Sequence, residues 1–206
     1  MLEPFEKIFI LGCGTCSTVC QTGGEEQVRD MAEKLREKGK EITGAIVVEL
    51  PCDARVLKRD TRKMKREIEN SGAILCMTCG AGVQDIFEHL GKTSIPALNT
   101  KFLGMIERIG EFYERCRACG ECILYDTGGI CPIVRCPKGM LNGPCGGMYN
   151  SKCEVGGYQR DCAWILIYNR LKELGMLDLY KSYKLPRDNS KLNVQPREIV
   201  WAKVGQ

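Results

Sequence analysis

The sequence predicts an α/β fold, with a parallel sheet in the first half of the chain and a small cysteine-rich domain after it. Three observations support this prediction. Strand-like and helix-like segments alternate up to about residue 110, the alternation stops near Tyr113, and the 206 residues include 14 cysteines but one histidine. Regular β–α alternation is typical of a parallel sheet with helices on both faces.

The first half contains four apolar segments with the length of strands. They lie at 7–12, 42–50, 73–77 and 94–100. Segments at 25–40, 53–70 and 81–91 are predicted to form the intervening helices, and 101–110 also has a helix-like pattern. Right-handed crossovers place the loops that follow the strands along one edge of the sheet. We therefore expect a flavodoxin-like domain over residues 1–110.

Between residues 113 and 157 the chain is rich in cysteine, glycine and proline and follows neither period. Compact domains rarely contain so long an irregular stretch, but metal–thiolate bonds can replace a hydrophobic core. We expect an iron–sulfur domain over 111–180, which includes a helix at 161–180 that ends at Gly175. Residues 181–206 are predicted to form an extended tail, either docked on a partner or loosely ordered.

Composition narrows the class of protein. The net charge of +4 and the 44% hydrophobic content are ordinary for a globular protein and do not call for a nucleic-acid partner. The N-terminus has no basic region typical of a signal peptide, and no apolar stretch approaches the roughly 20 residues that span a bilayer. We expect a cytoplasmic protein without a membrane span, whose reduced thiols are available to metals rather than committed to disulfides.

The first six cysteines all follow or end the expected strands, at the edge where open α/β sheets bind ligands. They are Cys13, Cys16, Cys20, Cys52, Cys76 and Cys79. Four thiolates suffice for a [4Fe–4S] cluster. The favoured set is Cys16, Cys20, Cys52 and Cys79. The other two adjoin strands, and they can instead point into the core, where free cysteine is common.

A second group of cysteines has motif spacing. It comprises Cys116, Cys119, Cys122, Cys131, Cys136, Cys145 and Cys153. The C-x-x-C-x-x-C triplet at its start resembles the bacterial ferredoxin run, although eight residues instead of three precede the next cysteine. This spacing favours iron–sulfur over zinc, while paired cysteines leave a closed zinc site as the competing interpretation. Cys162, in an apolar segment, is expected to lie in the core, although two clusters in the second half of the chain would need it as a ligand.

Other polar residues are expected to be less informative. His89 is interpreted as a surface histidine rather than a catalytic base. The basic stretch from Arg55 to Arg66 is interpreted as a solvated helix face, with an acidic partner or nucleotide phosphates as the alternative. We expect no acid–base catalyst in this chain.

Two stretches of the second half carry a resemblance to a known family. They read CRACGECILYDTGGICPIVRCPKGMLNGPCGG (116–147) and, after KCEV (152–155), DCAWILIYNRLKELG (161–175). The chain resembles the methylenetetrahydrofolate reductase C-terminal-domain proteins, including the MetV-type small subunit of acetogen reductases. The N-terminal KIFILGCGTCSTVCQTGGEEQV (7–28) is similar to the same subunit, so the resemblance spans nearly the whole chain.

In that family the cysteine-rich subunit accompanies a TIM-barrel flavoprotein that reduces 5,10-methylenetetrahydrofolate to 5-methyltetrahydrofolate. The resemblance implies an iron–sulfur electron-transfer subunit that relays electrons to the partner's flavin, within the one-carbon metabolism of the Wood–Ljungdahl pathway. It also implies association with hydrogenase-like or heterodisulfide-reductase-like electron-input subunits. The motif cysteines carry over as ligand candidates, whereas no flavin-binding or folate-binding position does.

Two other functions stay open. The chain could be a zinc-binding structural or assembly subunit of the same complex, since members of the family have been discussed as zinc carriers. A free-standing flavin- or nicotinamide-dependent oxidoreductase ranks last, because GCGTCS (12–17) only approaches the dinucleotide fingerprint. The favoured expectation is two or three [4Fe–4S] clusters, with zinc as the competing metal.

Overall fold

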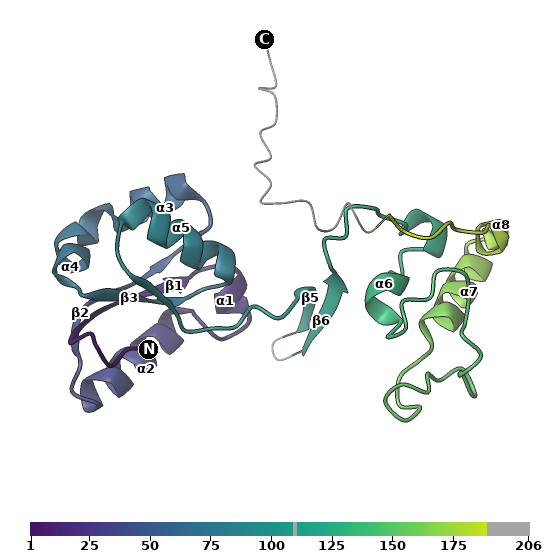
Figure 1. The fold of residues 1–206 in the computed structure, drawn as a ribbon, viewed down its shortest axis with the longest axis horizontal. Coiled ribbons are helices and arrows are strands. Elements are labelled where there is room, and N and C mark those ends of the chain that lie inside the picture. The colour runs from purple at the N-terminus through teal and green to yellow at the C-terminus, as the bar shows by residue number, and fades with distance from the viewer. Residues whose placement is uncertain (109–110, 189–206) are drawn as a thin grey trace, which may run out of the picture. The chain divides into compact units, whose positions relative to one another are not determined.

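The computed structural model describes residues 1–108 and 111–188, which form two compact units (Figure 1). Of the described residues, the first unit comprises 1–101, 106–108 and 111–113, and the second comprises 102–105 and 114–188. Each unit is described by itself below. No helix in the described ranges is both long enough and apolar enough to cross a bilayer.

A four-stranded parallel sheet forms the centre of the first unit. Its strands are β1 (Lys7–Cys13), β2 (Glu41–Val48), β3 (Ala73–Met77) and β4 (Ser94–Pro96), in the order β2-β1-β3-β4. This order equals the first four positions of the flavodoxin-like sheet, whose ligand crevice lies at the carboxyl ends of the first and third strands. The predicted α/β fold with a parallel sheet is confirmed.

Helices cover both faces of this sheet, as the alternating sequence pattern predicted (Figure 1). On one face lies α2 (Glu25–Glu37), and on the other lie α3 (Ala54–Thr61), α4 (Lys65–Asn70) and α5 (Gly80–Leu90). The short α1 (Cys16–Val19) occupies the loop after β1. Each helix on the second face begins shortly after a strand or a turn, so the strands' carboxyl ends meet the helix N-termini at one edge.

The central strand β1 divides its side chains between the two cores. Ile8 and Ile10 pack with α2, whereas Phe9 and Leu11 pack with α3 and α5, and all four are fully buried. Burial of one such side chain stabilises the fold by about 1.5–3 kcal/mol. The near-continuous apolar run of this strand follows from helices on both of its faces.

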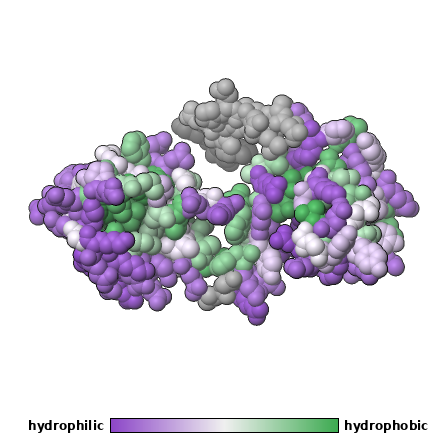
Figure 2. Space-filling model, turned by 60° about the horizontal axis from the view of Figure 1, so that its bottom comes forward, coloured by the Kyte–Doolittle hydropathy of each residue, from purple (hydrophilic) through white to green (hydrophobic). Residues whose placement is uncertain are grey.

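Two segments differ from the sequence-based expectation. The helix expected at 53–70 is interrupted by a 3-10 turn (Arg62–Met64) between α3 and α4. The helix-like pattern at 101–110 was misleading, because the structure has a strand there, β5 (Leu103–Arg108), in a two-stranded sheet with β6 (Glu111–Cys116). The side chains of β5 are exposed, and Figure 2 shows apolar surface over this hairpin. With no core for a helix face, pairing with the aromatic-containing β6 decides the conformation.

The second unit has a small core built around one helix. α7 (Ala163–Glu173) buries Trp164, Ile167 and Leu171, and Gly175 at φ +69° separates it from α8 (Leu177–Lys181). The single helix expected at 161–180 is therefore two. Two short elements complete the unit, η2 (Tyr125–Thr127) and α6 (Pro132–Arg135). Most of the tail expected at 181–206 lies outside the described residues, which end at Asp188.

The loop between β1 and α2 requires glycine at Gly23, because a Cβ there would overlap the carbonyl oxygen of Met77 in β3. We expect Gly23→Ala to lower the free energy of unfolding of the first unit by about 1–3 kcal/mol, since the backbone cannot move aside without disturbing the sheet. Urea unfolding of the anaerobic protein measures this change. Gly80→Ala is the control, because a Cβ there meets only Thr100 Oγ1 at 3.8 Å. A loss as large in Gly80→Ala would contradict the packing argument.

Candidate metal centres

The first candidate centre lies at the carboxyl ends of β1, β2 and β3. The loop after β1 folds back on the sheet, since Cys13 N donates to Gly23 O at 3.0 Å. Gly14 N donates to Val48 O at the end of β2 (2.8 Å). From α1, Thr18 Oγ1 donates to Cys13 O at 2.6 Å. These hydrogen bonds hold the cysteine loop over the sheet edge where this class of fold binds ligands.

The Cys13 thiol is held in a ring of hydrogen-bond donors. It is 4% exposed, and its sulfur lies 3.4 Å from Thr15 Oγ1. Burial raises the pKa of this thiol, but hydrogen bonds from the Thr15 side chain and from the backbone N–H groups of Ser17, Thr15 and Cys16 outweigh burial and bring the pKa below its ordinary value. Because the thiolate is the form that binds metals, this loop stabilises the ligating state of Cys13.

Three further thiols lie at the same edge: Cys16 in the same loop, and Cys52 and Cys79 in the loops after β2 and β3. Burial raises the pKa of the Cys52 thiol, and the neighbouring Cys79 raises it further, followed by Cys13 and Cys16. These four thiols are therefore close enough for the charge of one to act on another. Cys52 precedes the N-cap residue of α3 and Cys79 is the N-cap residue of α5, so both lie at helix N-termini, whose partial positive charge favours thiolates.

The thiols that act electrostatically on one another at this edge are thus Cys13, Cys16, Cys52 and Cys79, and they include three of the four favoured from the sequence. Cys20 ends α1 and is partly exposed. Cys76 is fully buried among the apolar side chains on the α3–α5 face, and its sulfur lies 3.5 Å from Ile74 O. Burial raises the pKa of Cys76 to about 12. Its position matches the alternative that this cysteine belongs to the core.

The second candidate centre is a small cavity in the second unit. It is lined by the last four cysteines of the sequence, Cys136, Cys145, Cys153 and Cys162. The cavity has a volume of about 10 Å³, which is roughly the space of one water molecule. Cys162 is the N-cap residue of α7, so the first turn of this helix faces the group. The donor set is soft and fits a thiolate-binding metal.

The walls of this cavity are fixed by contacts that the sequence pattern did not reveal. Lys138 and Glu154 form an ion pair beside Cys145, which raises the pKa of Lys138. A Cβ at Gly147 would overlap the Glu154 carboxylate, so a larger residue there would displace this side chain from its place beside the cavity. Trp164 Nε1 donates to Met140 O at 2.8 Å and ties the cavity to the core of the unit.

The C-x-x-C-x-x-C loop follows β6 directly and forms the third candidate centre. Its backbone is tightly curled, with left-handed φ angles at Ala118 (+49°) and Gly120 (+71°). Ala118 N donates to the Cys116 sulfur at 3.3 Å, and the Cys119 thiol donates to Glu121 O at 3.7 Å. A loop that wraps its cysteines and directs an N–H group to a sulfur is suited to an anionic cluster.

A cation from the C-terminal part of the described chain contacts the same loop. Arg187 Nη2 donates to Cys119 O at 3.3 Å. The other terminal nitrogen of Arg187, Nη1, is buried without a hydrogen-bond partner, and so is Glu121 Oε2. Cys131, the N-cap residue of α6, is partly exposed and is the remaining cysteine of the second unit.

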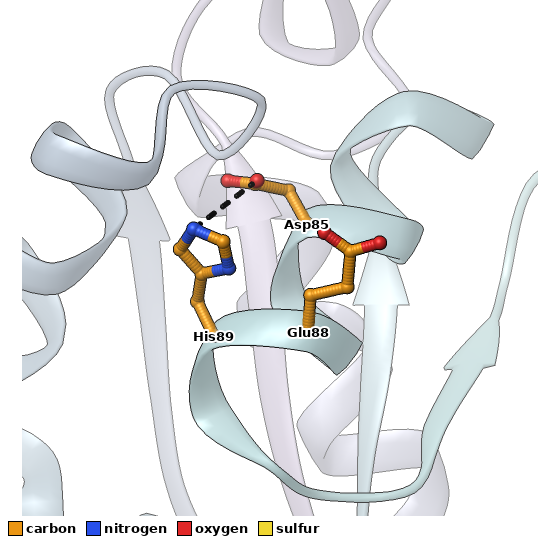
Figure 3. A group of neighbouring side chains, drawn as sticks. All are labelled: Asp85, Glu88 and His89. Carbon is orange, nitrogen blue, oxygen red and sulfur yellow. Dashed lines mark ion pairs between the residues drawn. The ribbon is translucent and has the colours of Figure 1, made fainter. Parts of the chain in front are cut away.

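In the described part of the chain, none of the three cysteine groups has three sulfur atoms within 4.8 Å of one another. Within residues 1–108 and 111–188, one set of three potential metal ligands has its atoms within 4.8 Å of one another, and it is Asp85, Glu88 and His89 on α5 (Figure 3). Tetrahedral zinc with Zn–S bonds of 2.3 Å holds its sulfurs about 3.8 Å apart. The cysteine side chains therefore have to rotate inward to bind one zinc ion. A [4Fe–4S] cluster holds its four sulfur ligands farther apart, because each thiolate binds a different iron.

Comparison with known proteins gives one family match, in the second half of the chain. Residues 95–190 match the family model described as Methylene-tetrahydrofolate reductase C terminal. The match spans all eight cysteines from Cys116 to Cys162 and supports the predicted family for this part of the chain. Residues 1–94, with the other six cysteines, lie outside it. No curated protein and no solved structure matches the chain.

Within the matched residues 95–190, Cys162 is the candidate ligand that sequence reasoning assigned to the core. Its apolar neighbours Ala163 and Trp164 suggested packing, and it is indeed 9% exposed. Counting already indicated the alternative, because two four-cysteine sites in the second unit need all eight of its cysteines. The cavity assigns Cys136 to the same group as Cys162 and leaves Cys131 for the C-x-x-C-x-x-C triplet.

Proposed function

We propose that this chain is an iron–sulfur electron-transfer subunit of a methylenetetrahydrofolate reductase complex. The observation that carries the proposal is the convergence of four thiols from three loops at the sheet edge, combined with a reductase-family region that contains eight more cysteines. Iron–sulfur clusters, when bound, supply one-electron transfer over a wide range of potentials. The resemblance to MetV-type small subunits agrees with this role.

The chain's own residues then serve to hold and tune the clusters. Cys13, Cys16, Cys52 and Cys79 hold the first, and the donors around the Cys13 sulfur stabilise its negative charge. In the second unit, the triplet with Cys131 holds another. Hydrogen bonds to sulfur and nearby positive charge favour the reduced state, because reduction adds an electron to an already anionic group.

The proposed partner is a TIM-barrel flavoprotein subunit that reduces 5,10-methylenetetrahydrofolate to 5-methyltetrahydrofolate. This chain would relay electrons to that subunit's flavin and receive them from hydrogenase-like or heterodisulfide-reductase-like subunits. The proposal places the protein in the cytoplasm, in the Wood–Ljungdahl pathway. It needs no flavin or folate site in this chain, in agreement with the absence of a matching position in the sequence motifs.

A second candidate function concerns the cavity lined by Cys136, Cys145, Cys153 and Cys162. Its volume of about 10 Å³ suits a single ion better than a cluster of eight atoms. A closed site of four cysteines is typical of structural zinc. The alternative is therefore a zinc-stapled assembly subunit, and the two candidates combine if zinc occupies this site while iron–sulfur clusters occupy the others.

Metal analysis of the full chain, purified without oxygen, tests the proposal. We expect roughly four iron and four sulfide per occupied cysteine quartet, an EPR signal after reduction, and oxidation of the reduced protein by the flavin of a methylenetetrahydrofolate reductase flavoprotein. The metal-free chain is the control for the flavin reaction. Near-stoichiometric zinc with negligible sulfide would refute electron transfer and leave the assembly role.

A further inference from the structure

A second cavity in the first unit is separate from every cysteine group. It lies between α3, the 3-10 turn, α4 and the end of α5, and has a volume of about 280 Å³, close to the lower limit of typical small-molecule sites. Lys58, Thr61, Arg62, Lys65, Ile68, Glu69, His89 and Leu90 line it. The helices run away from the carboxyl edge of the sheet, so this cavity is not part of the thiol site.

The charge of the cavity lining is positive. Lys65 pairs with Glu69 at 3.7 Å. Lys58 and Arg62 are exposed and make no ion pair or hydrogen bond with any residue in the described part of the chain. The basic residues next to them on α3 differ, because Arg55 pairs with Asp53 and Arg59 with Asp60 and Glu49. The cations left unpaired beside the cavity are therefore available to an anion.

Apolar side chains form the floor of the same cavity. Ile68 is 6% exposed and belongs to the core of the α3–α5 face, and Leu90 packs against that core. Thr61 is buried and donates its hydroxyl to Leu57 O at 2.7 Å, so it offers no free donor. A cationic rim above an apolar floor fits a ligand that has one charged end and one less polar end.

His89 completes one wall, and its surroundings disfavour a metal cation. Its Nε2 lies 3.9 Å from Asp85 Oδ1, with Glu88 beside them on the same helix (Figure 3). Oδ2 of Asp85 is buried without a hydrogen-bond partner. However, the bases Lys58 and Arg62 line the cavity next to His89 and would repel a cation. This side of the cavity therefore fits an anion better than a metal cation.

We infer that this cavity binds a small organic phosphate, whose phosphate group is held by Lys58 and Arg62 and whose less polar part rests on Ile68 and Leu90. Two cations can share one phosphate through charge-assisted hydrogen bonds, which are the strong class. Arg62 adds the planar fork that recognises phosphate oxygens. This site is independent of the proposed electron-transfer role.

Isothermal titration calorimetry on the metal-loaded full chain tests the inference, with ADP, pyrophosphate, inorganic phosphate and adenosine as probes at constant ionic strength. We expect ADP to bind more tightly than pyrophosphate, and both more tightly than adenosine. The double variant Lys58→Gln/Arg62→Gln should weaken ADP binding at least about tenfold, because each lost charge removes a charge-assisted hydrogen bond.

The double variant Lys63→Gln/Arg66→Gln is the matched control. It removes the same charge from exposed, unpaired positions of the same basic segment that do not line the cavity, and we expect ADP affinity within about twofold of the unchanged protein. Equal losses in the two double variants would show a diffuse basic surface and overturn the inference. Equal affinity for pyrophosphate and ADP would show that the less polar part of the ligand adds nothing to binding, and it would overturn the assignment of an organic phosphate. No binding of any phosphate would overturn it and leave an acidic protein surface as the partner of these bases.

Discussion

Replacing Cys162 with serine is expected to release the metal that we propose the last four cysteines hold, and to unfold much of the second unit. The buried core of this unit consists of Cys162, Trp164, Ile167 and Leu171, which is little for a segment of this length. Structural thiolate sites contribute about 10 kcal/mol or more to folding at neutral pH, so their loss exceeds what such a core supplies. Metal content together with limited proteolysis measures the change.

Ala163→Ser is the matched control for Cys162→Ser. Ala163 lines the same cavity and is 3% exposed, but its replacement leaves all four thiols in place. We expect this variant to keep its metal and its resistance to protease, with at most a modest loss of stability from the buried hydroxyl. If Cys162→Ser retained full metal content, Cys162 would be a core residue after all, as its apolar sequence context suggested.

Replacing Cys13 with serine is expected to remove one cluster from the first unit, whereas replacing Cys76 with serine is expected to leave it intact. The Cys13 sulfur is surrounded by Thr15 and three backbone N–H groups and lies close to Cys52. Cys76 is buried among apolar side chains on the α3–α5 face, where it pairs with Leu11 of β1, two residues back from Cys13. Each variant changes one sulfur near the end of a strand to oxygen, so the pair isolates the effect of position.

Iron and sulfide analysis with EPR distinguishes these two variants. Cys13→Ser should lose roughly four iron and four sulfide per chain, while Cys76→Ser should keep them and lose only about 1–2 kcal/mol of stability from burial of a more polar group. The reverse pattern would make Cys76, rather than Cys13, a ligand of the cluster. Equal iron in both variants and in the unchanged protein would argue against any cluster held by Cys13.

The two central strands of the first unit, β1 and β3, were predictable because each lies between two layers of helix. β3 begins and ends at the predicted residues, and β1 differs by one residue, since a fully buried strand carries a near-continuous apolar run. The segment at 101–110 was not predictable in this way. Its apolar residues suggested a helix face, but β5 is exposed and paired with β6, and pairing between segments leaves no trace in local periodicity.

The location of the first candidate centre was predictable from the sequence, although the set of cysteines that forms it was not. Cysteines after successive strands must meet at one edge of a parallel sheet, which follows from chain direction alone. Whether Cys13 or Cys20 turns toward Cys52 depends on the path of one loop. That path is set by hydrogen bonds such as Cys13 N to Gly23 O and Thr18 Oγ1 to Cys13 O, which no spacing rule contains.

By itself, the sequence determined the α/β class, the sheet edge that gathers the N-terminal cysteines, and the family resemblance of the cysteine-rich second half. These three features depend on the local periodicity of apolar residues, on the direction of the chain and on the spacing of cysteines within the motifs. Only the tertiary structure decided that Cys76 faces the core, that Cys162 joins Cys136, Cys145 and Cys153 around one cavity, and that Lys58 and Arg62 stay unpaired beside an apolar floor. Distances between residues far apart in the chain depend on strand order and loop path, and these arise from the packing of the whole unit.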